Sequence, residues 1–480
     1  MPVPEGPLVI GVDSSTQSTK VLVVDAADGS VVARGQAPHT VTPGRGADPE
    51  QWWRALTDAV GQCGPVVGRA AAVSVAGQQH GLVTLDGSGR PVRDALLWND
   101  TRSAPQRDRL VGELGGAQAW AERVGSVPGP AFTVTKWAWL RENEPASAAA
   151  TRAVRLPHDY LTGRLTGQEA RGGTTDRGDA SGTGWWSTAT GEYDHGVLAH
   201  VGLDPELLPR VVPPGEPAGT VRPGLPLPAG IPVAAGTGDN MAGALGLGLV
   251  PGRPVLSLGT SGTVYAVSTR RPADPTGVVA GFADAGHAFL PLACTLNCTL
   301  AVDRFAALLG LDREAAEPGG EAVVLPFLDG ERTPDLPGAT GLVHGLRHAT
   351  TGGQVLQAAY DGAVFALLRA LGQVLDGDGN GGDPAVPIVL IGGGARGTAW
   401  RETVRRLSGR PVLVPRAREL VAPGAAAQAA GLLLGRDPAA VARDWGTSDG
   451  PAYEAVARDD AALARIAAAL SDADALLRRS

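Results

Sequence analysis

The same short pattern opens both halves of this chain, and it limits the folds that the chain can adopt. Apolar strands predicted at 8–12 and 21–24 flank a polar segment from Asp13 to Lys20 that is rich in hydroxyl groups. The pattern returns at 255–258 and 264–267, around Gly259-Thr260-Ser261-Gly262-Thr263. We interpret this repeat as a weak internal duplication, and it predicts two related domains that face each other.

The length also predicts two domains. The chain has 480 residues, whereas a single hydrophobic core stops growing at roughly 250–300 residues. We place one domain at residues 1–245 and the other at residues 246–480. Apolar residues form 43% of the chain and charged residues 19%, which is a balance typical of globular proteins with sizeable cores.

Strands that alternate with helices predict an α/β fold. In the first half we expect a helix over 48–60 with Asp48 as its N-cap, strands over 70–76 and 231–235, and a helix over 241–250. In the second half we expect a strand over 387–391 and helices over 301–309, 354–371, 425–434 and 459–478.

Three further segments carry weaker signals. Residues 82–85 are expected to continue the first sheet, and residues 95–98 to form another strand. Glycine and proline are dense over 205–232, where we expect loops rather than a domain linker. Several of the expected strands therefore end in polar corners, and ligands of open α/β sheets bind beyond strand ends.

Charge and cysteine content narrow the classes of function. The net charge is −8 and no long basic run occurs, so we expect neither a nucleic acid nor a membrane as a partner. Cys63, Cys294 and Cys298 cannot form a closed set of disulfides and lack the partners of a zinc site. With no signal-peptide pattern at the N-terminus, these features predict a cytoplasmic protein.

A nucleotide would have to be held without a P-loop. A P-loop requires Gly-Lys followed by Ser or Thr, but the only lysines are Lys20 after Thr19 and Lys136 after Thr135. Backbone N–H groups of a concave turn can bind phosphate instead. Both hydroxyl-rich turns fit that use, although each alone is more often an ordinary hairpin. Asp13 is a candidate Mg²⁺ ligand, because Mg²⁺ takes one or two carboxylates plus waters and phosphates.

Asp239 is the candidate general base. It follows an expected strand in Gly236-Thr237-Gly238-Asp239-Asn240, and a carboxylate there could accept a proton from a hydroxyl that attacks phosphate. A helix cap is the alternative interpretation of Asp239, and the two roles are compatible because a helix N-terminus favours an ionised carboxylate.

Two polar corners are candidate sugar-binding sites. Gln79 and His80 follow one expected strand, and Trp98-Asn99-Asp100 follows another. A lone histidine such as His80 is more often structural, and a structural ion pair between Asp100 and Arg102 explains the second corner equally well. Gly392-Gly393-Gly394-Ala395, after a buried strand, could let a purine or ribose lie flat on the backbone.

These pieces, in this order, resemble the FGGY carbohydrate kinases of the actin, heat-shock chaperone and sugar kinase superfamily. The similarity covers the chain from Ile10 to about Leu434. It rests on the following stretches: 77–81, 97–100, 159–161, 236–240, 257–262, 325–327, 330–334 and 391–400.

The resemblance implies two ribonuclease-H-like domains around a deep cleft, with ATP and Mg²⁺ as cofactors and a sugar as substrate. D-xylulose is the implied sugar, and ribulose, gluconate and glycerol are the alternatives. The resemblance implies that Asp239 and Asp13 are catalytic residues and that Asp13 also holds the metal. The implied contacts are with the sugar for Gln79, His80, Trp98, Asp100, Asp239 and Asn240, and with ATP for Thr16, Lys20, Gly259, Thr260, Ser261, Gly262, Gly393, Gly394 and Ala395.

Two positions depart from the family pattern, and one other class of function competes with the kinase. Gln79 stands where the family often has Met, and Ser15 where it often has Gly, so the wall of the sugar site is expected to differ. An ATP-driven scaffold or chaperone is the rival function, although the chain has no large extension after residue 440 for a filament or peptide site. Family analogy also implies a homodimer.

Overall fold

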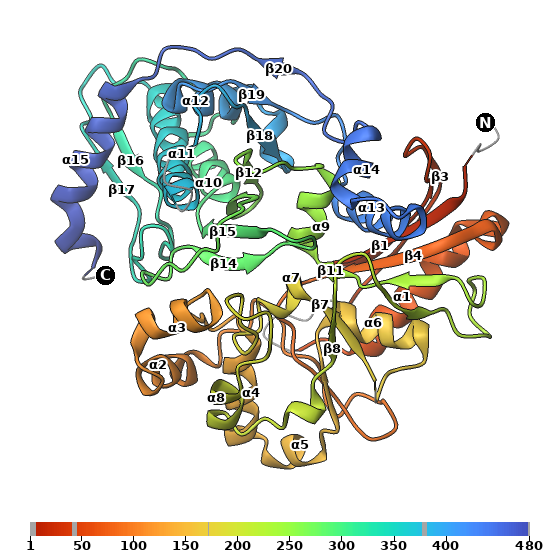
Figure 1. The fold of residues 1–480 in the computed structure, drawn as a ribbon. Coiled ribbons are helices and arrows are strands. Elements are labelled where there is room, and N and C mark those ends of the chain that lie inside the picture. The colour runs from red at the N-terminus through yellow and green to blue at the C-terminus, as the bar shows by residue number, and fades with distance from the viewer. Residues whose placement is uncertain (1–5, 41–45, 171, 377–381, 479–480) are drawn as a thin grey trace.

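Each half of the chain is built around one seven-stranded sheet (Figure 1). The computed structural model describes residues 6–40, 46–170, 172–376 and 382–478. The first sheet contains β1 (Leu8–Ser14), β2 (Ser18–Asp25), β3 (Val31–Pro38), β4 (Ala70–Gly77), β9 (Pro217–Thr220), β10 (Pro232–Ala234) and β11 (Thr237–Gly238). The second contains β12 (Pro254–Leu258), β13 (Gly262–Ala266), β14 (Ala280–Ala283), β15 (Phe289–Thr295), β18 (Ile388–Ile391), β19 (Val412–Leu413) and β20 (Ala452–Tyr453).

The two sheets share one topology. Their orders are β3-β2-β1-β4-β10-β9 and β14-β15-β13-β12-β18-β19-β20. In both, three antiparallel strands (β3-β2-β1 and β15-β13-β12) continue into two parallel ones (β4-β10 and β18-β19), and an antiparallel strand closes the edge. The predicted duplication and the predicted two-domain α/β fold are confirmed.

Helices cover the sheets, and their bounds follow the sequence signals closely. The first half holds α1 (Pro49–Gln62), α2 (Ala104–Glu113), α3 (Gly116–Val124), α4 (Thr133–Asn143), α5 (Pro145–Ala150), α6 (Pro157–Thr166), α7 (Arg177–Ala180), α8 (His195–His200) and α9 (Asp239–Gly246). The second half holds α10 (Thr299–Leu309), α11 (Gly352–Asp376), α12 (Thr398–Ser408), α13 (Val421–Leu434), α14 (Pro438–Asp444) and α15 (Asp460–Leu477). Asp48 caps α1 by accepting the Glu50 N–H, as predicted.

Short elements complete the fold. They are the 3₁₀ helices Gly64–Arg69, Pro205–Leu207 and Gly393–Arg396, and the strands β5 (Val83–Leu85), β6 (Ala153–Arg155), β7 (Thr174–Asp176), β8 (Arg210–Val212), β16 (Val323–Leu325) and β17 (Leu342–His344).

Three predictions about local structure were wrong. Residues 83–85 pair with β6 in a separate two-stranded sheet, because the chain turns away from the first sheet at His80, whose φ is +65°. Residues 95–98 form no strand, since only isolated bridges join Ala95 to Ala47 and Leu96 to Leu82. The segment 205–232 contains β8 and β9 as well as loops, and Pro217 is tolerated because β9 is an edge strand.

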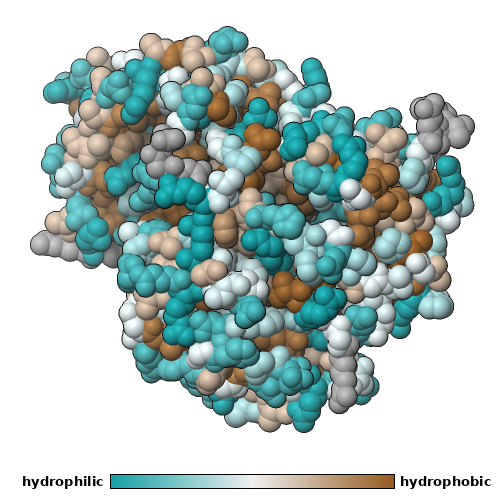
Figure 2. Space-filling view, in the orientation of Figure 1, coloured by the Kyte–Doolittle hydropathy of each residue, from teal (hydrophilic) through white to brown (hydrophobic). Residues whose placement is uncertain are grey.

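α11 is the one described helix that is long and apolar enough to cross a membrane, judged by length and composition. Its most apolar window is 72% buried inside the protein. The helix packs against β13, β15 and β16, so burial in the second half accounts for its composition. Polar residues cover much of the face shown in Figure 2.

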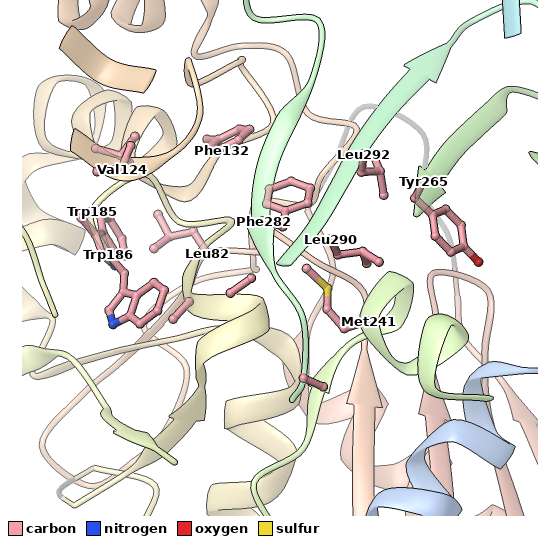
Figure 3. Packing of buried hydrophobic residues seen from close by; sticks show 14 of the residues in the cluster. Leu82, Val124, Phe132, Trp185, Trp186, Met241, Tyr265, Phe282, Leu290 and Leu292 are labelled. Carbon is pink, nitrogen blue, oxygen red and sulfur yellow. The ribbon is translucent and has the colours of Figure 1, made fainter. Parts of the chain in front are cut away.

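An apolar cluster joins the two halves. Figure 3 shows Phe132 of the first half near Phe282 of the second, and Trp185, Trp186 and Leu290 belong to the same buried cluster. Arg177 extends this contact, because its guanidinium donates to the Asp284 carboxylate and to backbone oxygens of the same segment. The segment after α6 therefore binds β14 and β15 directly.

Two helices also cross between the halves at very short range. α13 packs on β1, β4 and α9, although in sequence it lies between β19 and β20 of the second sheet. A Cβ added to Gly424 of α13 would lie 1.8 Å from the Ala242 oxygen of α9, and one added to Gly246 would lie 2.0 Å from the Leu420 oxygen. Only glycine allows the two backbones to approach this closely.

This crossing predicts the effect of adding one methyl group. Gly424→Ala should destabilise the protein by about 1–3 kcal/mol, because the helices must move apart. Gly372→Ala in α11 is the matched control. Its added Cβ meets nothing within 4 Å, so it should stabilise by about 0.4–1 kcal/mol. Thermal unfolding of both variants tests this, and a Gly424→Ala protein as stable as the wild type would contradict it.

Candidate active site

Three parallel strands bring the first-half candidates together at one edge of the sheet. β4 pairs with β1 on one side and β11 on the other, so that Gly77 stands opposite both Ser14 and Gly238. Asp13 lies at the end of β1, Gln79 and His80 follow β4, and Asp239 follows β11. The backbone is tight here, because a Cβ on Gly238 would lie 2.5 Å from the Gln79 side chain.

Side-chain hydrogen bonds link these strand ends. Thr16 Oγ1 donates to Gln78 Oε1 over 3.2 Å, and Trp98 Nε1 donates to Thr16 over 3.0 Å. Asn240 Nδ2 donates to Gln79 Oε1 over 2.7 Å. Trp98 is 45% exposed, so its ring has a free face beside the site. The predicted residues Thr16, Gln79, Trp98 and Asn240 thus belong to one group.

Asp239 is the first residue of α9 and makes no ion pair with any described residue. Its Oδ1 accepts the Asn240 backbone N–H over 2.9 Å. The residue is partly exposed, yet enough protein surrounds its carboxyl group for desolvation to raise its pKa to about 7, and the charges of Asp13 and Asp179 add to the rise. A carboxylate with this pKa is suited to accept a proton near neutral pH.

Asp13 lies beside Asp239 and contacts a cation. Burial raises the pKa of Asp13 to about 6, while Lys20 lowers it. Lys20 Nζ lies 3.7 Å from Asp13 Oδ2 and 2.7 Å from Glu419 Oε2, and Glu419 belongs to the second half. Asp13 Oδ1 is buried without a hydrogen-bond partner. That unsatisfied oxygen fits a Mg²⁺ ligand, since one carboxylate with waters and phosphates is enough for this ion.

The hydroxyl groups of the first turn are partly occupied within the turn. Ser14 Oγ lies 3.0 Å from Thr19 Oγ1, which lies 2.9 Å from His39 Nε2. Ser15 Oγ donates to the Ser18 oxygen. These hydroxyls stiffen the turn, and Thr16, on the side of Gln78 and Trp98, is the one of them that faces the other candidates.

His80 is held in a strained backbone conformation. Its carbonyl accepts bonds from Lys136 Nζ and Thr133 Oγ1, and its Nδ1 lies 2.8 Å from the Gly182 oxygen. Its ring stacks on Phe132 at 5.0 Å and approaches Phe282 of the second half at 5.6 Å. Burial, with the charge of Lys136, lowers the pKa of His80 to about 3, so the imidazole is neutral and can donate or accept only one hydrogen bond from each nitrogen.

A buried network behind the site was not found from the sequence. His158 Nδ1 bonds to Asp179 Oδ2 over 2.7 Å, and Asp176 Oδ2 accepts from Thr237, two residues before Asp239. A Cβ on Gly236 would lie 2.7 Å from the His158 ring. Asp159 and Asp176 help to raise the pKa of His158 against its burial, so an imidazolium balances the carboxylates. This network fixes β11 against β4.

Other contributors were also missed. Lys136 is fully buried, and burial lowers its pKa to about 7. The rarity of lysine in this chain was the only feature of the sequence that set Lys136 apart. Glu419 and the Asp176–Asp179 pair had no local signal, because their partners are distant in sequence. Gln428 of α13 is similar: it accepts from Ser74 and donates to the Gly236 oxygen.

The second turn and the glycine segment are neighbours in the second half. Ser257 stands opposite Ile391 in parallel pairing, so Gly259 to Gly262 and Gly393 to Ala395 follow adjacent strands. The Gly259 oxygen accepts from the backbone N–H and hydroxyl of Thr299. Thr260 and Ser261 are exposed. An open cavity of about 1050 Å³ begins at Arg396 and Gly397, directly after the glycine segment, and is also lined by Asp312, Glu314 and Arg406.

Some predicted residues are not joined to this group. Asp100 bonds to Arg102 Nε over 2.9 Å, the ion pair that the sequence offered as an alternative. No hydrogen bond or ion pair within the described residues connects Asp239 with the second turn. The halves meet beside the site through Lys20 with Glu419, and through His80 with Phe282. Among the described residues no cluster of three or more His, Cys, Asp or Glu could hold a metal ion.

Comparison with known proteins agrees with this arrangement. Residues 8–246 match the N-terminal domain of the FGGY family of carbohydrate kinases, and residues 255–432 match its C-terminal domain. Xylulose kinase of Streptomyces rubiginosus is 71% identical over 99% of this chain and 98% of that protein. Xylulose kinase of Escherichia coli strain K12 is 33% identical over 84% and 85%.

A solved structure adds agreement in three dimensions. The xylulose kinase from Bifidobacterium adolescentis has a TM-score of 0.86 and 36% identity, and the match covers 97% of this chain and 99% of that one. Both family domains are present in order and relatives match over nearly the full length. The chain belongs to the FGGY family of carbohydrate kinases.

Proposed function

We propose that this protein transfers the γ-phosphoryl group of ATP to D-xylulose and forms D-xylulose 5-phosphate. The observation that carries the proposal is the position of Asp239 at the start of α9, near Asp13 and the Gln79–Asn240 pair, where its carboxylate makes no ion pair within the described part of the chain. The sugar is inferred from the relatives, which are named xylulose kinase and match along the whole chain.

Asp239 acts as the general base in this reaction. The sugar hydroxyl lies against its carboxylate, which takes the proton as the oxygen attacks phosphorus. Asn240 donates to both Asp239 and Gln79, so it sets the carboxylate at a fixed place relative to the sugar. Gln79, His80 and Trp98 bind the remaining hydroxyls and cover the sugar.

The phosphates lie between the two turns. Thr16 and Lys20 of the first turn and Gly259 to Gly262 of the second donate to phosphate oxygens, and the adenosine lies along Gly393 to Ala395 with its base toward the 1050 Å³ cavity. Asp13 holds Mg²⁺ through its unsatisfied oxygen. A bound Mg²⁺ supplies charge neutralisation at the phosphates. The three thiols are free, which supports a cytoplasmic location.

A sugar panel tests the substrate. ADP release should be fastest with D-xylulose and slower with D-ribulose, gluconate and glycerol. The reason is that a poorly matched sugar would leave the polar groups of Gln79 and His80 without hydrogen-bond partners. A coupled assay at matched concentrations measures this. Fastest turnover of another sugar would overturn the substrate, and ADP release that no sugar accelerates would overturn the kinase function.

Removal of the base tests the mechanism. Asp239→Asn should lower kcat by roughly 10²–10⁴-fold, since a positioned general base contributes that much, while ATP and sugar still bind. Asp437→Asn is the matched control, because Asp437 also begins a helix but lies on the surface. Calorimetric binding together with kcat separates the two effects, and near-wild-type kcat in Asp239→Asn would refute the assignment.

The pH profile provides a second check. Asp239 must be ionised to accept a proton and its pKa is about 7, so kcat/KM should fall as the pH drops below about 7. Asp13, with a pKa of about 6, must be ionised to hold the metal, so the fall should steepen below about pH 6. A profile of kcat/KM for the sugar measures both, and a flat profile down to pH 5 would contradict both assignments.

A further inference from the structure

The segment from Gly330 to Pro334 lies beside the second turn, and the roles described above leave it unused. Glu331 is 1% exposed. Its carboxylate accepts the backbone N–H groups of Leu296 over 2.6 Å, of Asn297 over 3.2 Å and of Arg332 over 2.7 Å. This buried carboxylate therefore fixes the backbone of Arg332 against the end of β15.

Strand pairing then relates Arg332 to the phosphate turn. Thr333 Oγ1 donates to the Cys294 oxygen over 2.9 Å, and Cys294 stands opposite Thr263, with Thr295 opposite Gly262. Burial raises the pKa of the Cys294 thiol, whereas the charge of Arg332 and hydrogen bonds from Thr263 and Arg332 oppose the rise. The guanidinium of Arg332 thus lies next to the strand that leaves Gly259 to Gly262.

The same guanidinium acts on the sugar side of the site. After burial and Lys136, the charge of Arg332 is a further cause of the low pKa of His80. The strand hairpin that carries Cys294 also carries Phe282, whose ring is 5.6 Å from the ring of His80. Thr333, the neighbour of Arg332, is thus bonded to β15 beside the second phosphate turn, and the charge of Arg332 acts on His80.

The site has more negative than positive side chains near the expected position of the phosphoryl group. Asp13 and Asp239 are acidic, and burial keeps His80 neutral. Lys20, which the proposed function places on the phosphates of ATP, lies on the first turn and is bonded to Glu419 in this structure, and Lys136 is fully buried with its donors on backbone oxygens. Arg332 is exposed and makes no ion pair with any described residue. A phosphoryl group that enters between two carboxylates would be repelled without compensation.

We propose that Arg332 is a catalytic residue that binds the phosphoryl group as it passes from ATP to the sugar. The inference rests on the kinase function proposed above. In the transfer, the bond from phosphorus to the ADP oxygen breaks and the bond to the sugar oxygen forms, while the hydroxyl proton goes to Asp239. Negative charge spreads over the three remaining phosphoryl oxygens. The planar guanidinium donates two parallel N–H groups to such oxygens.

Two substitutions and a control test the role. Arg332→Gln should lower kcat by roughly 10²–10³-fold, as loss of a transition-state charge stabiliser does elsewhere, with little change in the KM of the sugar. Arg332→Lys should recover part of the loss, because it restores the charge without the fork. Arg347→Gln removes an equally exposed arginine on the loop between β17 and α11 and should leave kcat unchanged.

A binding measurement separates this inference from the proposed function. Calorimetric titration with D-xylulose 5-phosphate needs no turnover, and Arg332→Gln should weaken binding of the phosphorylated sugar but not of D-xylulose. If the wild type prefers another sugar, the same comparison uses that sugar and its phosphate, and Arg332 is tested although the substrate was wrong.

Three outcomes would overturn the role of Arg332. The first is a kcat of Arg332→Gln close to wild type. The second is a higher KM for the sugar at unchanged kcat, which would make Arg332 a sugar contact. The third is equal loss in Arg332→Gln and Arg332→Lys with a lowered Tm, which would make it structural.

Discussion

The candidate site depends on the position of β4 between β1 and β11. All three strands run parallel, so their carboxyl ends meet at one edge of the first sheet. Asp13, Gln79 and Asp239 come from distant parts of the chain, and only this pairing brings them together. Backbone hydrogen bonds set the register of the three strands. The side chains near Ser14, Gly77 and Gly238 therefore have fixed positions relative to one another. Gly77 and Gly236 pack so closely against His158 that neither position has room for a Cβ. This contact supports the strand ends on the side away from the site.

The same arrangement creates an electrostatic cost. Burial raises the pKa of Asp239, and the charges of Asp13 and Asp179 raise it further, while burial and the charge of Glu419 raise the pKa of Asp13. His158 offsets the inner carboxylates, since its imidazolium lies within hydrogen-bond distance of Asp179 and close to Asp159. Among the described residues, Asp239 makes no ion pair with a cation, and its carboxyl group keeps a pKa of about 7. In the proposed function, groups that arrive with the nucleotide or from the second half would compensate the phosphate charge.

The sequence was most informative where the fold repeats a local pattern. Strands ending in hydroxyl-rich or glycine-rich turns were visible twice, and the cap at Asp48 and most helices followed from spacing and end signals. Asp239 was selected as a candidate base because it follows a strand among small residues, and the structure places it at the start of α9. His158, Lys136, Glu419 and Arg332 could not be placed in this way, since each acts through partners that only tertiary contacts bring near. The prediction of a strand at residues 95–98 was wrong for the same reason. An apolar run does not show whether another strand lies alongside to pair with it.

The contacts between the halves differ greatly in strength. The apolar cluster around Phe132 and Phe282 is buried, and so is the glycine crossing of α9 with α13. Separating these contacts would expose apolar surface to water, at a free-energy cost of about 25 cal/mol per Å². The pair of Lys20 with Glu419 is partly exposed, with side chains at 26% and 50%, and exposed pairs contribute only about 0–1 kcal/mol. In the proposed function, a phosphate, which carries more charge than one carboxylate, would therefore replace Glu419 on Lys20 at little cost. The halves would then adjust around the nucleotide on the side of Lys20, while the buried contacts keep Asp239 and His80 in place.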